Sequence, residues 1–221
     1  MNLYRTTQWA LVVIVIVYFV LGIAYSIVNP ILESPDEVLN YENIRFFAEE
    51  RRLPRLVEGE ISKGHHPPLY YTLGALLVGW VPNQHLETIV DRTNPFWAYR
   101  MWESGVDNKN LYLHDPQLEG WPYQDVSLGV HVMRWVSVVL GTGVIVVIYH
   151  ITRDLFPKAP WLAVGAVALV AFNPMFLYIQ SSVHNDALTN LWAALTLWGV
   201  VRYWQRGPST KRAAWLGLVC G

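Results

Sequence analysis

The chain has 221 residues, of which 53% are hydrophobic and 15% are charged, and its formal net charge is −1. Soluble domains average about 25% charged residues, so this composition argues against an ordinary soluble protein. The near-zero net charge gives no reason to expect nucleic acid as a partner. Cys220 is the single cysteine, which excludes an intrachain disulfide.

The first predicted element is an apolar run at residues 9–28. These 20 residues carry no formal charge, which is enough for a helix to cross roughly 30 Å of hydrocarbon. A secretory signal peptide would have a shorter apolar core and a small-residue cleavage site, which residues 24–26 resemble only weakly. We therefore expect an uncleaved membrane anchor.

Residues 29–127 follow as one long segment that we expect to lie outside the membrane. Juxtamembrane helices are predicted within it at about 35–52 and 68–81, lying in the interface as amphipathic helices do. Residues 83–127 contain several X-Pro turns and predict an ordered loop with little regular structure.

The second of these helices is apolar, but it does not have the length of a transmembrane helix. It has only about 13 residues before Pro82, which is short for a crossing. We expect it to lie at or dip into the outer interface, with Tyr70, Tyr71 and Trp80 as headgroup anchors.

Three further apolar runs, at residues 128–151, 161–179 and 187–204, are each long enough for a membrane helix. A fifth run begins at Ala213 and continues for nine residues, which rise only about 14 Å and cannot span. The predicted fold class is all-α and integral to the membrane, with about four transmembrane helices and the start of a fifth. We expect a fragment of a larger membrane protein or a truncated copy.

Basic residues predict the orientation of these spans. The N-terminus and the loops after the second and fourth spans carry Arg5, Arg153, Lys158, Arg206, Lys211 and Arg212. Because cytoplasmic loops carry an excess of Lys and Arg, all three are expected in the cytoplasm. The chain then divides into an anchor at 1–28, an extracytoplasmic segment at 29–127, and the remaining membrane helices at 128–221, with the cell membrane as its location.

The segment 34–37, with the sequence SPDE, directly follows the first span. It fits a capping box in which Ser34 is the N-cap and Glu37 occupies the third helical position. Asp36 then lies in the first turn, where the helix dipole favours its ionised form, on a polar face with Asn40. Such a carboxylate could take a proton from a hydroxyl acceptor. Alternatively, both carboxylates only cap the helix.

Three basic side chains are further candidates. His65 and His66 precede the second juxtamembrane helix and could contact a phosphate or a metal, or simply keep an interfacial loop polar. Their spacing does not fit a metal site on a single helix. Arg134 lies one to two turns inside the second span, where its guanidinium could bind a phosphate at the outer surface or extend to the headgroup layer.

Asn185 and Asp186 begin the fourth span on the outer side, where Asp186 could serve a site or act as an ordinary N-cap. The expected topology places the candidates on one side of the membrane: Asp36, His65, His66, Arg134 and Asp186. Intramembrane and interfacial ionisable residues are costly and usually functional, which favours an enzyme over a plain anchor.

The order of these motifs resembles the N-terminal part of the GT-C superfamily of membrane glycosyltransferases, near the dolichyl-phosphate-mannose mannosyltransferase-like family and its bacterial relatives. The matching segments are PDE at 35–37, HPPLYY at 66–71, RWVS at 134–137 with Gly141, RDLF at 153–156, NP at 173–174 and ND at 185–186. The resemblance extends over nearly the whole chain.

The resemblance implies a many-span helical fold and an inverting transfer of a sugar from a polyprenyl-phosphate donor on the outer face. It implies Asp36 as the catalytic base or acceptor-orienting group, with Glu37 in support. The substrate-binding residues that it implies are His65, His66, Tyr70, Arg134, Asn185 and Asp186. Some superfamily members use a divalent metal and others do not, so the need for a metal stays open.

Two features depart from the family pattern. Asn40 occupies a position where relatives often carry His, and the chain has about four spans where relatives have many more. These departures motivate an alternative, a non-catalytic membrane subunit that packs with other membrane subunits in a larger complex. A transporter is disfavoured, because the charged residues gather at one surface and few ionisable groups lie at mid-depth.

Overall fold

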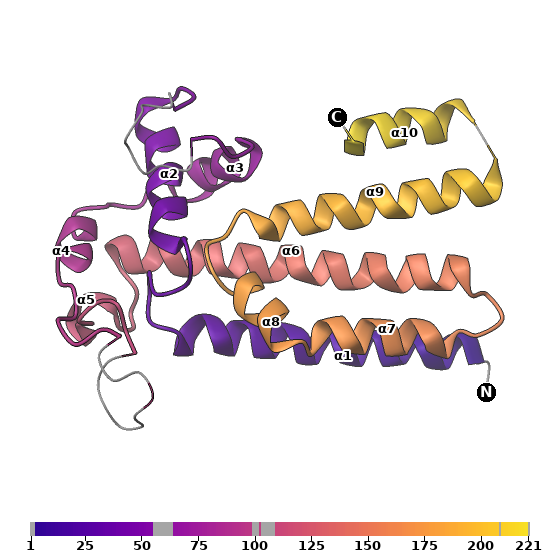
Figure 1. Ribbon diagram of the computed structural model, residues 1–221, viewed down its shortest axis with the longest axis horizontal. Coiled ribbons are helices and arrows are strands. Elements are labelled where there is room, and N and C mark those ends of the chain that lie inside the picture. Colours follow the sequence, from indigo (N-terminus) through magenta and orange to yellow (C-terminus); the bar gives the residue numbers. More distant parts are fainter. Residues whose placement is uncertain (1–2, 55–63, 99–101, 103–108, 208, 221) are drawn as a thin grey trace. The chain divides into compact units, whose positions relative to one another are not determined.

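The computed structural model describes residues 3–54, 64–98, 102, 109–207 and 209–220. Within these ranges every regular element is a helix (Figure 1), and the β contacts amount to one isolated antiparallel bridge between Thr93 and Tyr112. The all-helical architecture is therefore confirmed for the described residues. The chain forms two compact units: a bundle unit of Met1–Ser26 with Trp135–Gly221, and an insert unit of Ile27–Arg134.

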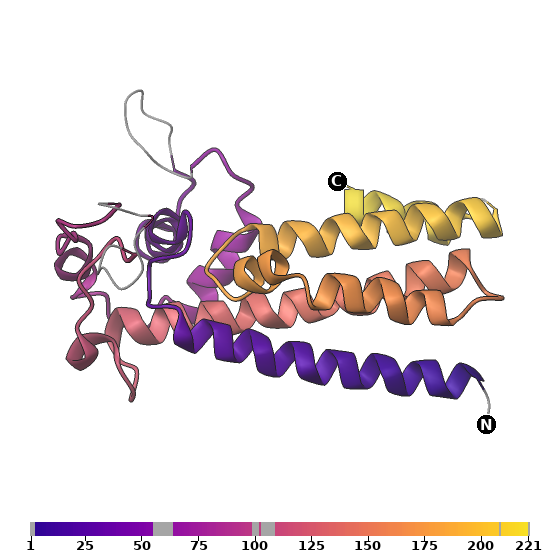
Figure 2. The ribbon, with the colours of Figure 1, turned by 60° about the horizontal axis from the view of Figure 1, so that its bottom comes forward.

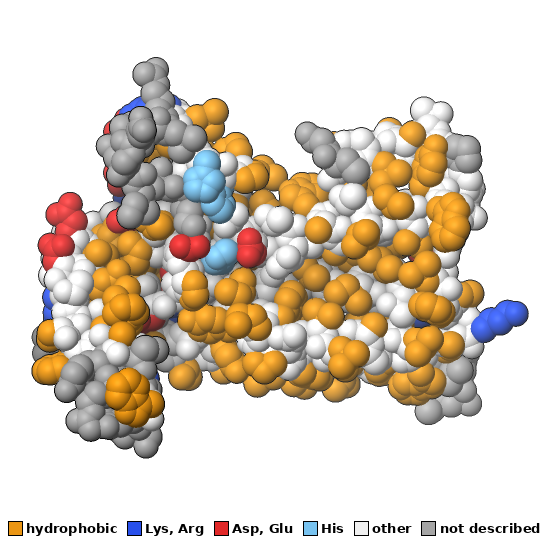
Figure 3. Space-filling model, in the orientation of Figure 1, with side chains coloured by type: hydrophobic (Ala, Val, Ile, Leu, Met, Phe, Trp, Pro, Cys, Tyr) orange, Lys and Arg blue, Asp and Glu red, His pale blue; other side chains and the backbone are white. Residues whose placement is uncertain are grey.

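The bundle unit is built from helices of different lengths. They are α1 (Leu3–Val28), most of α6 (Asp125–Leu155), α7 (Trp161–Ala171), α8 (Pro174–Gln180), α9 (Asp186–Arg206) and α10 (Thr210–Cys220). Of these, α1, α6, α7 and α9 run side by side (Figures 1 and 2). Its core brings together α1, α6 and α7 through buried side chains such as Ile14, Tyr18, Val138, Ile145 and Val167. Hydrophobic side chains also spread over the outside of these helices (Figure 3), as a helix in contact with lipid requires.

Two described helices are long and apolar enough to cross a membrane, Arg5–Val28 and Asp125–Leu155. The pair α7 and α8 would make a third if it is one span, although the two helices are bent by 64°. Helix α9 covers the fourth expected span and has 21 residues, but it is not apolar enough to count among the helices that could cross. An integral membrane protein is supported, and the count of four spans stays a prediction.

The bend between α7 and α8 has a local cause. Pro174 at the start of α8 lacks the N–H that would continue the helix from α7. The side-chain oxygen of Asn173 accepts hydrogen bonds from the backbone N–H groups of Met175 at 2.9 Å and Phe176 at 3.3 Å, so Asn173 caps the new helix.

The insert unit contains shorter helices: α2 (Glu37–Glu50), α3 (Leu69–Val78), α4 (Leu86–Val90), α5 (Pro116–Glu119) and the first residues of α6. Helices α2 and α3 lie within the ranges 35–52 and 68–81. Residues 55–63, 99–101 and 103–108 of the predicted outer segment lie outside the described residues.

Helices α2 and α3 pack closely and run parallel. The Tyr71 hydroxyl donates a 2.9 Å hydrogen bond to Oδ1 of Asn40, and a Cβ at Gly74 would come within 2.8 Å of the Ile44 side chain. Gly74 therefore allows the close approach of the two helices. Farther along both helices, Nη1 of Arg45 donates to the carbonyl oxygen of Val78 at 3.3 Å.

This packing shows that two of the expected headgroup anchors are wrong. Tyr70 and Tyr71 are both buried in the insert unit, since α3 turns them toward protein rather than toward a bilayer surface. Trp80, just beyond α3, is 70% exposed. Amphipathic rings act as interfacial anchors only where their apolar part can reach lipid, which the two tyrosines cannot do here.

Candidate functional site

A buried ion pair between Arg134 and Glu37 anchors the start of α2. Nε of Arg134 lies 2.9 Å from Oε1 of Glu37, and Nη2 lies 2.6 Å from Oε2, so the pair is bidentate. Both side chains are 0% exposed. Such a pair requires its other donors to be satisfied, and Arg134 also donates to the carbonyl oxygens of Asn29 at 2.7 Å and Pro30 at 2.8 Å.

The ion pair explains why the expected capping box is wrong. Helix α2 begins at Glu37, and Asp36 is the N-cap residue, with no side-chain capping hydrogen bond. The Glu37 side chain contacts Arg134, while its backbone N–H donates to the carbonyl oxygen of Ser34 at 3.0 Å. The local sequence predicted the wrong cap because the guanidinium of Arg134, 97 positions later in the chain, binds the Glu37 carboxylate that would have completed the box.

The loop before α2 has an unusual backbone. Leu32 has a φ of 65° and Asp36 a φ of 60°, both in the left-handed region. A bulky residue rarely adopts this conformation, and each such position costs of order 1–3 kcal/mol. The Leu32 side chain is buried and the bonds from Arg134 hold the preceding carbonyls, so the surroundings impose the conformation. Asp36 is left exposed at the end of this loop.

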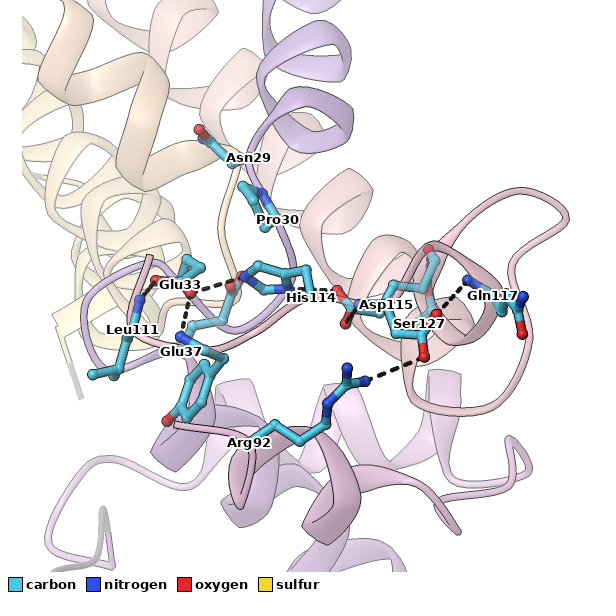
Figure 4. Close-up of polar contacts among 12 residues, drawn as sticks. Asn29, Pro30, Glu33, Glu37, Arg92, Leu111, His114, Asp115, Gln117 and Ser127 are labelled. Atoms are coloured by element: carbon cyan, nitrogen blue, oxygen red, sulfur yellow. Dashed lines mark hydrogen bonds and ion pairs between the residues drawn. The ribbon is translucent and has the colours of Figure 1, made fainter. Parts of the chain in front are cut away.

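Glu33 fastens the same loop to a distant segment (Figure 4). Its two carboxylate oxygens accept hydrogen bonds from the backbone N–H groups of Leu111 at 2.7 Å and Tyr112 at 2.8 Å. Nε2 of His114 lies 2.9 Å from Glu33, and Nδ1 of the same ring lies 2.6 Å from Glu119. One imidazole therefore bridges two carboxylates.

Within this bridge, the pKa of His114 is raised and the pKa of Glu33 is lowered. Burial lowers the pKa of His114, but the hydrogen bonds to Glu119 and Glu33 and their negative charges outweigh it and raise that pKa to about 9. Burial raises the pKa of Glu33, yet the hydrogen bonds from His114 and from two backbone amides bring it below its ordinary value. The bridge is therefore a charged one at neutral pH.

Parallel packing of α2 and α3 brings Asp36 and the two histidines to the same end of the helix pair. Asp36 lies four residues before Asn40, and His66 lies five residues before Tyr71, which is the hydrogen-bond partner of Asn40. The rings of His65 and His66 meet edge to face with their centroids 4.3 Å apart. His65 is exposed and His66 half-buried, so both imidazoles have surface that a ligand can reach.

Asn185 and Asp186 belong to the bundle unit, at the start of α9. Asn185 is buried at the N-cap position without a side-chain capping bond, while Asp186 is 53% exposed at its side chain. Nδ1 of His184 lies 3.5 Å from the Asp186 carboxylate and accepts a 3.2 Å hydrogen bond from its backbone N–H. The expectation that Asp186 and Asp36 face the same side of the membrane stays a prediction.

The solvent exposure of each side chain decides which residues of the insert unit can contact a substrate. The carboxylate of Glu37 is bound to Arg134, and neither side chain has surface for a substrate. Asp36 is the exposed carboxylate next to this pair, and an exposed base can reach the proton of a bound hydroxyl group. The first turns of α2 and α3 add partial positive charge at the same end, which favours an anion such as a phosphate.

Among the residues that the structure describes, no group of three or more His, Cys, Asp or Glu side chains is arranged to hold a metal ion. The need for a divalent metal stays open, as the sequence leaves it.

Sequence reasoning did not single out Glu33, His114 and Glu119. Glu33 and His114 are 81 positions apart, and neither sits in a recognisable motif. The turn-rich stretch 83–127 was predicted to be an ordered loop, and the Glu33 bridge shows how residues 111–114 of it are tied to the start of α2.

Residues 128–221 match the family model for dolichyl-phosphate-mannose-protein mannosyltransferase. The resemblance to membrane glycosyltransferases of the GT-C type is confirmed over these residues. No curated protein and no solved structure matches the chain significantly.

The GT-C match begins inside α6 and includes Arg134, Asn185 and Asp186. Asp36, His65 and His66 lie before it. The match therefore supports a membrane glycosyltransferase as the class of protein, whereas the roles of individual residues depend on the geometry of the insert unit.

Proposed function

We propose that this protein is an inverting membrane glycosyltransferase that moves a sugar from a polyprenyl-phosphate donor to a hydroxyl acceptor at the outer face of the membrane. The GT-C match supports the reaction class. The observation that carries the site is Asp36, an exposed carboxylate on a left-handed backbone, next to the fully buried pair of Glu37 and Arg134.

The Lys and Arg residues in the connecting loops support an outer location for residues 29–127. The loop between α6 and α7 carries exposed Lys158, and the turn between α9 and α10 is flanked by Arg206 and Lys211. Lys and Arg concentrate in cytoplasmic loops, so both of these connections are assigned to the cytoplasm. A single crossing by α1 then leaves residues 29–127 on the outer side.

The proposed step conserves atoms and electrons. The acceptor oxygen forms a bond to the anomeric carbon of the sugar, and the bond from that carbon to the donor phosphate oxygen breaks. The electron pair of the broken bond leaves with the polyprenyl phosphate. Asp36 takes the proton of the acceptor hydroxyl, and attack opposite the leaving group inverts the anomeric centre.

Glu37 and Arg134 are proposed as positioning residues. Because the Glu37 carboxylate is bidentate to Arg134, it does not take the acceptor proton, and the guanidinium is held by protein partners rather than by a phosphate. Their role is to hold the loop from Asn29 so that Asp36 stays in place. This assignment revises the direct phosphate contact that the sequence suggested for Arg134.

His65 and His66 are proposed to contact the donor phosphate at the end of the helix pair where Asp36 lies. The imidazoles have accessible surface there, and two helix N-termini favour the anion. Tyr70, which is buried, would shape the wall of the site rather than bind the sugar. Asn185 and Asp186 remain proposed contacts for the acceptor.

The decisive experiment replaces Asp36 by Asn and measures sugar transfer from a labelled polyprenyl-phosphate donor with the protein in liposomes. A general base contributes typically 10²–10⁴-fold, so we expect a loss of roughly that size. Asp91→Asn is the matched control, because Asp91 is also an exposed aspartate of the insert unit but lies at the end of α4. The melting temperature of both variants should stay close to that of the wild type.

Turnover that is unchanged in Asp36→Asn would refute the assignment of the base. Absence of transfer by the wild-type protein, together with its recovery in fixed ratio with other membrane subunits, would instead favour the non-catalytic subunit.

A further inference from the structure

A cationic hollow lies between α9 and α10 in the bundle unit, toward the C-terminal end of α9, whereas Asn185 and Asp186 lie at the start of that helix. Its volume is about 400 Å³, and it is lined by Trp198, Arg202, Arg206, Lys211, Arg212 and Trp215. Four cationic side chains and two indole rings therefore share one small space near the turn that joins α9 to α10.

Gly199 explains how the hollow forms. A Cβ at this position would collide with the Trp215 ring and come within 2.7 Å of Leu216, so only glycine allows α10 to lie this close to α9. The rings of Trp198 and Trp215 meet edge to face, with centroids 6.3 Å apart. The two rings give the hollow an apolar floor.

The charges around the hollow are unbalanced. Asp154 at the end of α6 lies 3.1 Å from Nε of Arg202 and 4.0 Å from Nη2 of Arg206. It is the one acidic residue among the described residues that pairs with any of the four cations, which leaves an excess of three positive charges around the hollow. Lys211 is exposed and has no ion-pair partner among the described residues.

The arrangement of the cations suits a phosphate at the mouth of the hollow. The Arg202 guanidinium lies over the Trp198 ring, 4.5 Å from its centroid, and is thereby fixed in place. Nη1 of Arg212 donates to the carbonyl oxygen of Arg206 at 2.7 Å, which ties the turn together. Arg206 and Lys211 flank that turn, and α10 begins there with the positive end of its dipole.

We propose that this hollow binds the headgroup of an anionic phospholipid of the bilayer. Tryptophan and basic residues at a helix end are typical of the membrane interface, where acyl chains can follow the indoles while the phosphate meets the guanidinium groups. Basic pockets between membrane helices are known to hold anionic headgroups. The inference is independent of sugar transfer, because it depends only on the geometry of α6, α9 and α10.

The test is a lipid titration of the purified protein, followed by native mass spectrometry, with phosphatidylglycerol compared with phosphatidylcholine of the same acyl chains. We expect tighter binding of phosphatidylglycerol. The double variant Arg206→Gln with Lys211→Gln should weaken that binding about thirtyfold, since each cation near an anionic lipid surface contributes about 1 kcal/mol.

The matched control removes the same charges elsewhere, at Arg51 and Lys158, which are both exposed and do not line the hollow. It should bind phosphatidylglycerol as the wild type does. If the double variant unfolds, Lys211→Gln alone replaces it, because Lys211 is exposed. Equal binding of both lipids, an unchanged affinity in the variant, or displacement of the lipid by inorganic phosphate at equal concentration would each overturn the proposal.

Discussion

Replacing Arg134 by Met should strongly destabilise the protein, because it leaves the Glu37 carboxylate buried without a partner. Both side chains are 0% exposed, so water cannot take over the lost hydrogen bonds. Met has a similar length and fills most of the space, so the change tests charge and hydrogen bonding rather than volume.

The expected loss of stability in Arg134→Met follows from the complete burial of the ion pair. Removing one partner of a buried ion pair costs about 3–5 kcal/mol. For a chain of 221 residues, about 2–4 °C of melting temperature correspond to each kcal/mol, which predicts a decrease of roughly 6–20 °C. The double variant with Glu37→Gln should recover part of this loss, but the carbonyl oxygens of Asn29 and Pro30 would still lack their donor, at about 1–3 kcal/mol.

The assay is thermal unfolding in detergent micelles, followed by tryptophan fluorescence for the wild type, both single variants and the double variant. Arg52→Met is the matched control, because Arg52 is also paired, with Glu50 at 3.2 Å, but both side chains are about half exposed. Exposed pairs contribute about 0–1 kcal/mol, so this variant should melt close to the wild type. An Arg134→Met variant that melts like Arg52→Met would refute the reasoning.

Two further predictions test the insert unit and the close packing of its helices. The pKa of His114 is raised to about 9, so its charged form stabilises the folded protein fully below pH 6.5, and this contribution is lost as the pH rises through 9. The melting temperature should therefore fall over that window in the wild type and much less in His114→Gln, whereas equal pH profiles would contradict the bridge to Glu33. Gly129→Ala should destabilise by about 1–3 kcal/mol, because the added Cβ would overlap the hydroxyl group of the buried Tyr41. Gly165→Ala is its control, since nothing lies within 4 Å of the added Cβ, and a variant at Gly129 that melts like the control would show that the ring moves freely.

Several features of the protein could be predicted from the sequence because they depend on local composition. The apolar runs at 9–28 and 128–151 became helices long enough to cross a membrane, since hydropathy over about 20 residues is a local property. The order of short motifs indicated a resemblance to the GT-C type, which the family match supports over residues 128–221. The break at Asn173 and Pro174 also has a local cause, because a proline and a capping amide end one helix and begin the next, but we expected residues 161–179 to form one unbroken span.

Tertiary structure decided what the individual side chains do. Glu37 fits a capping box by sequence, yet it pairs with Arg134, 97 positions away. Tyr71 fits an interfacial anchor, yet packing of α3 against α2 buries it. A capping rule or an aromatic at a helix start describes only the preference of an isolated segment, whereas a buried charge must be matched by whichever opposite charge the fold brings to it. That requirement cannot be read from neighbouring residues, so the partner of Glu37 and the exposed position of Asp36 emerge only when the chain is folded.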